Sequence, residues 1–208
     1  MAAFRTYAVE LVAAFFVTLA LLGAASQDVL VGALAVAATV GLVVRSGAHA
    51  NPALTMAAVV GRRLAGAELL PCWAAQFVGA LIAAATGRWL VEAPAVSPLQ
   101  DVGVVTLLVT ELLFAFALCY VVLDGDRGEH MPRWLPDGGA ALAGGLTVLA
   151  SAALLDPVGA AAFNPAAAFG QVVAGITGWG TIWVYLVACP VGGVLAGLTA
   201  RQASSRPG

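Results

Sequence analysis

The stretch SGAHANPALT at residues 46–55 returns in shortened form as FNPA at residues 163–166. The triplet Asn-Pro-Ala therefore occurs twice, and Asn51 and Asn164 are the only asparagines of the chain. Asparagine is a good helix N-cap and proline suits the first helical turn, so each triplet predicts the start of a helix. The apolar segments that follow, Pro52–Val60 and Pro165–Ile176, would reach only about half-way across a bilayer at roughly 1.5 Å per residue.

The composition around these triplets indicates a membrane protein. Of the 208 residues, 62% are hydrophobic and 10% are charged. This excludes intrinsic disorder and argues against a soluble domain, because too few polar residues remain to cover a surface. The net charge of −2 gives no indication of nucleic-acid binding. We interpret Cys72, Cys119 and Cys189, which lie in apolar runs, as buried small hydrophobes rather than disulfide or metal partners.

Six apolar segments are about long enough to cross the hydrocarbon core as helices. They are Tyr7–Ala25, Val29–Val44, Leu69–Val91, Val102–Leu123, Gly138–Leu155 and Trp179–Ala200. We therefore predict an all-α membrane protein with six transmembrane helices and two half-helices, in a single domain over residues 1–208. Glu10 inside the first segment favours a retained span over a cleaved signal peptide. With the N-terminus in the cytoplasm, every arginine except Arg88 falls on the cytoplasmic side, and the connection Asp124–Asp137 is an inner loop.

The two halves of the chain resemble each other. Val9-Glu10-Leu11 returns as Thr110-Glu111-Leu112, and each half carries one Asn-Pro-Ala triplet between its second and third spans. Three spans per half is an odd number, so the second half must be inserted upside-down relative to the first. This predicts an inverted repeat, about 4–91 and about 102–200, with broken helices that meet near the midplane.

These motifs resemble those of the aquaporin, or major intrinsic protein, family. Residues 46–55 are close to its SGAHxNPAxT loop, and the second triplet continues to Phe169-Gly170. Further matches are Trp73, Gln76, Gly79 and Ala80 on the third span, Gly145-Leu146-Thr147-Val148 on the fifth, and Trp183-Val184-Tyr185, Pro190 and Gly192-Gly193 on the sixth. The resemblance implies two half-helices that meet at the bilayer centre, and a homotetramer in membrane lipid with one pore per subunit.

The resemblance also implies roles for single residues. The pore motifs are Asn51, Pro52 and Ala53 in the first half, and Asn164, Pro165 and Ala166 in the second. Glu10 and Glu111 would brace the loop backbones, although an intramembrane acid is also a candidate for a proton relay. His49 would hold its loop rather than gate the pore.

The expected mechanism rests on the helix ends. Each half-helix has free N–H groups and about half a positive charge at its N-terminus, so two facing ends repel cations and protons while the asparagines donate to neutral molecules. The chain is then a passive channel for water or small uncharged solutes.

The sequence departs from the family at the outer selectivity filter. Its four positions fall on Val31, Ala152, Ala161 and Ala167, and the last replaces the arginine that usually follows the second triplet. None of these side chains donates a hydrogen bond or carries charge. We therefore predict a wider, apolar outer constriction that passes glycerol-like polyols, urea, ammonia or peroxide.

Other classes of function stay open or are disfavoured. A non-conducting scaffold on the same fold is an alternative, and a secondary transporter would have only Glu10 and Glu111 as ion-coupling carboxylates. We see no nucleophile–base pair, metal cluster or phosphate loop, so we expect no enzyme, no metal and no cofactor. We expect a multi-pass protein of the inner (plasma) membrane with both termini in the cytoplasm.

Overall fold

The computed structural model describes residues 2–25, 27–90, 103–125, 139–155 and 163–204. All regular elements in these ranges are helices, and six of them are long. These are α1 (Ala2–Ala24), α2 (Val29–Arg45), α4 (Leu69–Leu90), α5 (Val104–Gly125), α6 (Gly139–Leu155) and α8 (Ile182–Ser204). The two half-helices are α3 (Pro52–Val60) and α7 (Pro165–Ala174). Single 3₁₀ turns, η1 (Gly66–Glu68) and η3 (Trp179–Thr181), precede α4 and α8.

The helix lengths fit a bilayer, which confirms the expected all-α membrane fold. Four segments are long and apolar enough to cross a membrane: Phe4–Ala24, Gly66–Leu90, Val104–Gly125 and Trp179–Ala203. Helices α2 and α6 have 17 residues each, which corresponds to about 25 Å at roughly 1.5 Å per residue.

Some boundaries differ from the prediction. Helix α1 begins at Ala2, before the apolar run starts, and α5 continues through Asp124 to Gly125, so the predicted inner loop begins later than expected. Helix α7 ends at Ala174, two residues before the predicted end, because Gly175 adopts φ 84° and closes the helix with a left-handed cap. The rest of the predicted inner loop, residues 126–137, lies outside the described residues.

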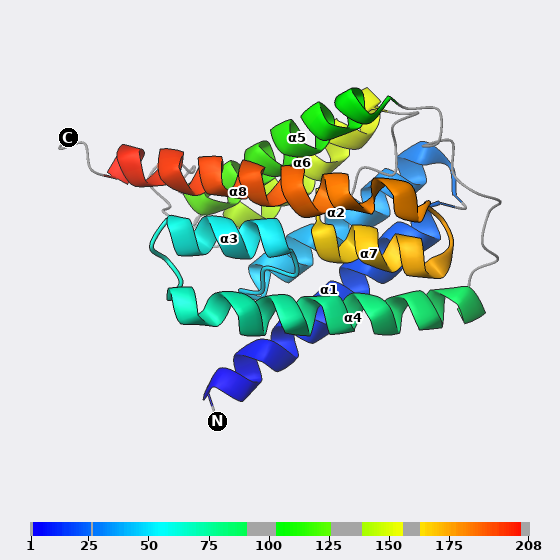
Figure 1. Cartoon of the computed structure of the whole chain (residues 1–208), viewed down its shortest axis with the longest axis horizontal. Coiled ribbons are helices and arrows are strands. Elements are labelled where there is room, and N and C mark those ends of the chain that lie inside the picture. The colour runs from blue at the N-terminus through cyan, green and yellow to red at the C-terminus, as the bar shows by residue number, and fades with distance from the viewer. Residues whose placement is uncertain (1, 26, 91–102, 126–138, 156–162, 205–208) are drawn as a thin grey trace.

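The helices pair in a pattern that repeats between the two halves. The most extensive packing joins α1 to α4 in the first half and α5 to α8 in the second, and α2 packs against α6 across the halves. Each half-helix packs on the last helix of the other half: α3 on α8, and α7 on α4. Figure 1 shows α3 and α7 one after the other along the middle of the molecule, between α4 and α8. This exchange places both half-helices at the centre.

Glycines allow the paired helices to approach closely. A Cβ added to Gly79 of α4 would collide with the carbonyl oxygen of Leu11, and one added to Gly192 of α8 would collide with that of Leu112. These are equivalent contacts in the two halves. Small residues at such interfaces are typical of membrane helices, where tight van der Waals packing replaces the hydrophobic effect.

The repeat extends beyond the Asn-Pro-Ala triplets. The residue spacing that separates Asn51 from Asn164 also relates η1 to η3 and the first residue of α4 to that of α8. It relates Arg62, with φ 61°, to Gly175, with φ 84°. Each half-helix is therefore followed by one left-handed residue, one 3₁₀ turn and one long helix, and equivalent residues can be assigned through this whole region.

The cysteines agree with their interpretation as small hydrophobes. Cys72, Cys119 and Cys189 are buried and none of them forms a disulfide.

Candidate functional site

The two asparagines begin the two half-helices. Asn51 and Asn164 have nearly the same extended backbone, with φ of −150° and −149°. The Oδ1 atom of Asn51 accepts a hydrogen bond from the backbone N–H of Ala53 at 2.8 Å. That of Asn164 accepts from the N–H groups of Ala166 and Ala167 at 3.1 and 3.3 Å. These bonds satisfy part of the free donors of each helix end and fix each amide with its nitrogen turned outward.

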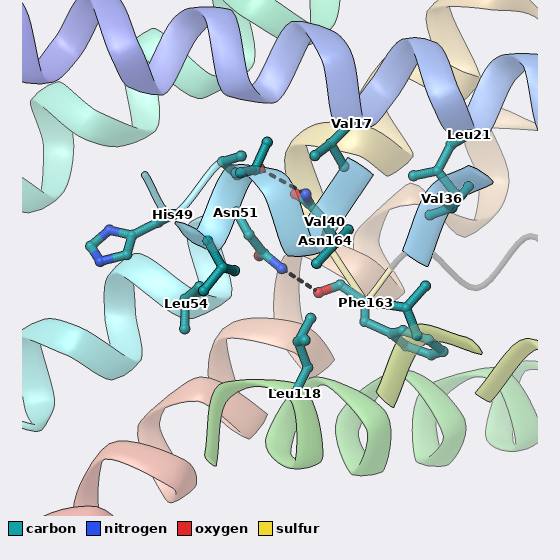
Figure 2. A pocket seen from close by; sticks show the side chains of 14 residues that line it. Val17, Leu21, Val36, Val40, His49, Asn51, Leu54, Leu118, Phe163 and Asn164 are labelled. Carbon is teal, nitrogen blue, oxygen red and sulfur yellow. Dashed lines mark hydrogen bonds between the residues drawn. The ribbon is translucent and has the colours of Figure 1, made fainter. Parts of the chain in front are cut away.

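The amide nitrogens bind the two halves to each other. Asn51 Nδ2 donates to the carbonyl oxygen of Phe163 at 2.9 Å, and Asn164 Nδ2 donates to that of Ala50 at 2.8 Å. Figure 2 shows these two bonds side by side at the centre of the site. An amide nitrogen carries two hydrogens, so one bond to the opposite half leaves each asparagine a second donor.

Ala50 and Phe163, which precede the asparagines, have a strained backbone. Their φ angles are 52° and 45°, a region that residues with a Cβ rarely adopt. Each is held at both polar groups: the Ala50 N–H donates to Glu10 Oε2 at 2.8 Å and the Phe163 N–H to Glu111 Oε2 at 3.0 Å. We assigned no role to these two residues from the sequence, although each immediately precedes the asparagine of a repeated triplet.

The Glu10 carboxylate is held within a network of donors. It is 3% exposed and accepts hydrogen bonds from the backbone N–H of His49 and the side chain of Gln76, each at 2.8 Å, in addition to that of Ala50. The fully buried Glu111 also accepts a hydrogen bond from the Cys189 thiol at 3.2 Å. Both carboxylates thus contact the backbone before the asparagines, which is the geometry of a brace.

His49 is tethered to the same network. Its Nδ1 lies 3.2 Å from Thr55 Oγ1 and 3.5 Å from Glu10 Oε1. Thr55 Oγ1 donates to the Asn51 carbonyl at 3.1 Å and accepts from Gln76 Nε2 at 2.8 Å. The imidazole therefore connects its loop to the first turn of α3 and to Glu10 of α1, and Gln76 joins α4 to the same network.

Two cavities meet at this site. A central cavity of about 40 Å³ contains both asparagines and is otherwise lined mainly by aliphatic side chains, among them Val17, Leu21, Val36, Val40, Leu54, Leu118 and Val148. A second cavity of about 270 Å³ lies beside α3 and includes Glu10, Arg63 and Cys72. His49 and Leu54 line both cavities, so the two adjoin. In Figure 2, Leu118 points from α5 toward the asparagine pair.

The electrostatics of the central cavity favour neutral molecules. Two helix N-termini face it, each with about half a positive charge, and two amide donors are the main polar side chains on its wall. A cation entering such an apolar space loses its water without gaining an anionic partner, which costs several kcal/mol or more. A neutral hydrogen-bond acceptor loses far less.

Of the four predicted filter positions, the structure describes the side chains of Val31 and Ala167. Val31 is 53% exposed near the start of α2, whereas Ala167 is fully buried in the first turn of α7. Neither residue lines the two cavities described above. Ala152 belongs to α6, but its side chain, like the whole of Ala161, lies outside the described residues. Among the described residues, no group of three or more His, Cys, Asp or Glu could hold a metal ion.

Known proteins resemble this chain along most of its length. Residues 4–200 match the family "Major intrinsic protein". The probable aquaporin TIP3-2 of Arabidopsis thaliana is 35% identical over 166 residues, which cover 74% of this chain and 57% of that protein. The glycerol uptake facilitator protein-like 6 of Lactiplantibacillus plantarum is 31% identical over 77% of this chain and 76% of its own length. The aligned part thus spans little more than half of the plant relative.

The fold has a counterpart among solved structures. The aquaglyceroporin of Plasmodium falciparum superposes with a TM-score of 0.79 over 98% of this chain and 97% of its own, at 18% identity. At that identity the likeness concerns the fold alone.

Proposed function

Because this chain belongs to the major intrinsic protein family, whose members are channels rather than enzymes, we propose that it is a passive transmembrane channel for water and small uncharged solutes. Ions and protons are excluded where the two half-helices meet. The pore motifs are Asn51, Pro52 and Ala53 with Asn164, Pro165 and Ala166.

The main support for this proposal is that both asparagine amides line the same small cavity, and each has one N–H donor that is not used by the bond to the opposite half. The Asn51 and Asn164 nitrogens are held by carbonyl groups of the opposite half at 2.9 and 2.8 Å. Their remaining N–H groups offer a hydrogen-bond donor to a passing water or solute at the point where the aliphatic wall offers none. This keeps the energetic cost of crossing low for a neutral molecule and high for a cation.

The central cavity supports passage in single file. Its volume of about 40 Å³ compares with roughly 10–15 Å³ needed for one water by the same kind of measure. A few waters, or one small organic solute in extended form, would fill it. The second cavity is larger and supplies a vestibule on the α3 side.

The outer filter of Val31, Ala152, Ala161 and Ala167 remains part of the proposal. These side chains form an apolar constriction without arginine, and the solute class therefore includes bulkier neutral molecules such as polyols, urea, ammonia or peroxide. The name of the Lactiplantibacillus relative, a glycerol uptake facilitator-like protein, favours this class.

The two alternatives differ in what they require. A secondary transporter needs a carboxylate that binds and releases an ion, but Glu10 is committed to three hydrogen-bond donors. A non-conducting scaffold is favoured by the aliphatic wall of the central cavity, since a hydrophobic constriction can close by dewetting. Measurement of flux separates the scaffold from the channel.

We place the protein in the plasma (inner) membrane as a homotetramer in which each chain is one channel domain over residues 1–208. Both termini face the cytoplasm, in accord with the arginine distribution. The exposed faces of the long helices carry large apolar side chains such as Val12, Leu113 and Leu186, which suit lipid or a neighbouring subunit.

Stopped-flow light scattering on proteoliposomes tests the channel directly. The wild-type protein should accelerate water movement, or the re-swelling that follows solute entry, over protein-free vesicles. Leu118→Trp places a bulky ring in the central cavity and should abolish the acceleration, while Leu113→Trp, on the exposed face of α5, should not. A folded wild-type protein that accelerates neither water nor any of the named solutes would show that the chain is a scaffold.

A further inference from the structure

The two cavities described above reach the α3 side of the passage but not the wall of α7. On the α3 side, Leu54 and Ala58 line the cavities, as does Cys72 of α4. On the α7 side, neither cavity is lined by any residue from Pro165 to Ala174. A pore that continues past the asparagines needs walls on this side too, and the inverted repeat indicates which residues supply them.

The repeat assigns the equivalents of the residues that line the α3 side. The spacing between Asn51 and Asn164 relates Leu54 to Ala167, Ala58 to Gln171, and Cys72 to Tyr185. The same spacing relates η1 to η3, so it holds along this whole segment. Positions 167 and 171 lie one helical turn apart on one face of α7. This face of α7 therefore continues the face of α3 that lines the passage.

Gln171 and Tyr185 carry polar atoms that the fold leaves unused. Gln171 is 2% exposed and Tyr185 is 1% exposed, and neither the Gln171 Oε1 atom nor the Tyr185 hydroxyl has a hydrogen-bond partner in the described part of the chain. An amide oxygen or hydroxyl buried in this way normally destabilises the folded state. Because both groups lie on the side that the repeat assigns to the pore, we expect them to form hydrogen bonds with a permeating molecule.

Thr18 of α1 carries a third buried polar atom, next to the residue that precedes Gln171. It is 1% exposed, its Oγ1 has no partner among the described residues, and its methyl group lies against Gly170, the neighbour of Gln171. On α1 it lies between Val17 and Leu21, which line the central cavity. The unpartnered atoms of Thr18 and Gln171 thus belong to residues at or next to the contact between α1 and α7, beside the passage.

We propose that Gln171, assisted by Thr18 and Tyr185, is the polar selectivity site of the α7 half of the pore, one turn beyond Ala167 where the arginine is missing. This rests on the proposed channel function. An uncharged amide both donates and accepts, as do the two hydroxyl groups. The site therefore selects small neutral solutes that carry donor and acceptor groups together, such as urea, and it neither repels nor attracts an ion by charge.

Cysteine substitution tests the position without relying on transport. Gln171→Cys should react with a small water-soluble methanethiosulfonate in reconstituted protein. Val172→Cys is the matched control, since it lies on the same helix, is 3% exposed, and points from a different face. The unsubstituted chain sets the background from Cys72, Cys119 and Cys189. Equal labelling of the two variants above that background, or labelling of Val172→Cys alone, would overturn the assignment.

Selectivity tests the role. Gln171→Met keeps the length of the side chain and removes both polar groups. We expect urea flux to fall about fivefold, the factor that one lost neutral hydrogen bond represents, while water flux changes less than twofold. A proportional loss of both fluxes would mean that Gln171 only supports the fold. If the wild-type protein conducts nothing, the channel proposal fails, but the labelling contrast between positions 171 and 172 still decides where Gln171 lies.

Discussion

Replacement of Asn164 by aspartate should convert part of the barrier against cations into an attraction. The carboxylate keeps an oxygen in the place of Oδ1, so the N–H groups of Ala166 and Ala167 stay capped, and an anion is favourable at a helix N-terminus by about 0.3–1 kcal/mol. The substitution removes the donor that holds the Ala50 carbonyl at 2.8 Å. A buried acceptor left without its donor costs about 1–3 kcal/mol, which is less than the total stability of a typical protein, about 5–15 kcal/mol, so the variant should still fold.

The effect on a passing cation is larger. A unit charge about 4 Å from the new carboxylate gains roughly 4 kcal/mol at an effective dielectric constant of about 20. Each 1.36 kcal/mol is a factor of about ten, so entry of Na⁺ or K⁺ should increase by up to about a thousandfold over the wild-type leak. Asn164→Ala is the matched control, because it removes the donor and the cap without adding charge.

The assay is cation flux into proteoliposomes, measured with an ion-sensitive dye at a matched protein-to-lipid ratio. Asn164→Asp should admit cations, and Asn164→Ala should not, although the alanine variant should be the less stable by about 0.5–2 kcal/mol because its helix loses its cap. If both variants leak alike, the leak comes from a damaged fold. If neither leaks, the positive potential of the half-helix ends is not what excludes cations, and the electrostatic reasoning fails.

Three further predictions address the fold and the filter. Glu10→Gln should lower the free energy of unfolding by about 2–3 kcal/mol, because an amide cannot accept from three donors with the strength of a carboxylate; an unchanged denaturant midpoint would contradict the brace. Gly192→Val should reduce the yield of folded protein, while Gly180→Val, with open space around it, should not, as judged by size-exclusion chromatography. Ala167→Arg should reduce urea or glycerol flux more than water flux in the stopped-flow assay, and equal losses would count against the proposed filter.

Much of this fold could be predicted from the sequence because its signals are local. The long apolar segments can be recognised as spans without knowledge of their packing partners, since any apolar helix of sufficient length is stable in the bilayer. The triplets at 51–53 and 164–166 predict helix starts through the preferences of asparagine and proline themselves. Their recurrence, together with Glu10 and Glu111, also predicts the inverted repeat.

The candidate site depended on contacts that no local pattern encodes. The bonds from Asn51 to Phe163 and from Asn164 to Ala50 join residues from opposite halves of the chain, and the left-handed backbone of Ala50 and Phe163 persists because those bonds and the two glutamates hold it. The same reason applies to Gln171. In sequence it is one polar residue near the end of an apolar helix. The structure distinguishes it in two ways: its amide is buried among packed helices, and its position is equivalent to that of Ala58, which lines a cavity. Helix formation is a property of neighbouring residues, whereas the environment of a side chain is fixed by whatever distant segments pack against it.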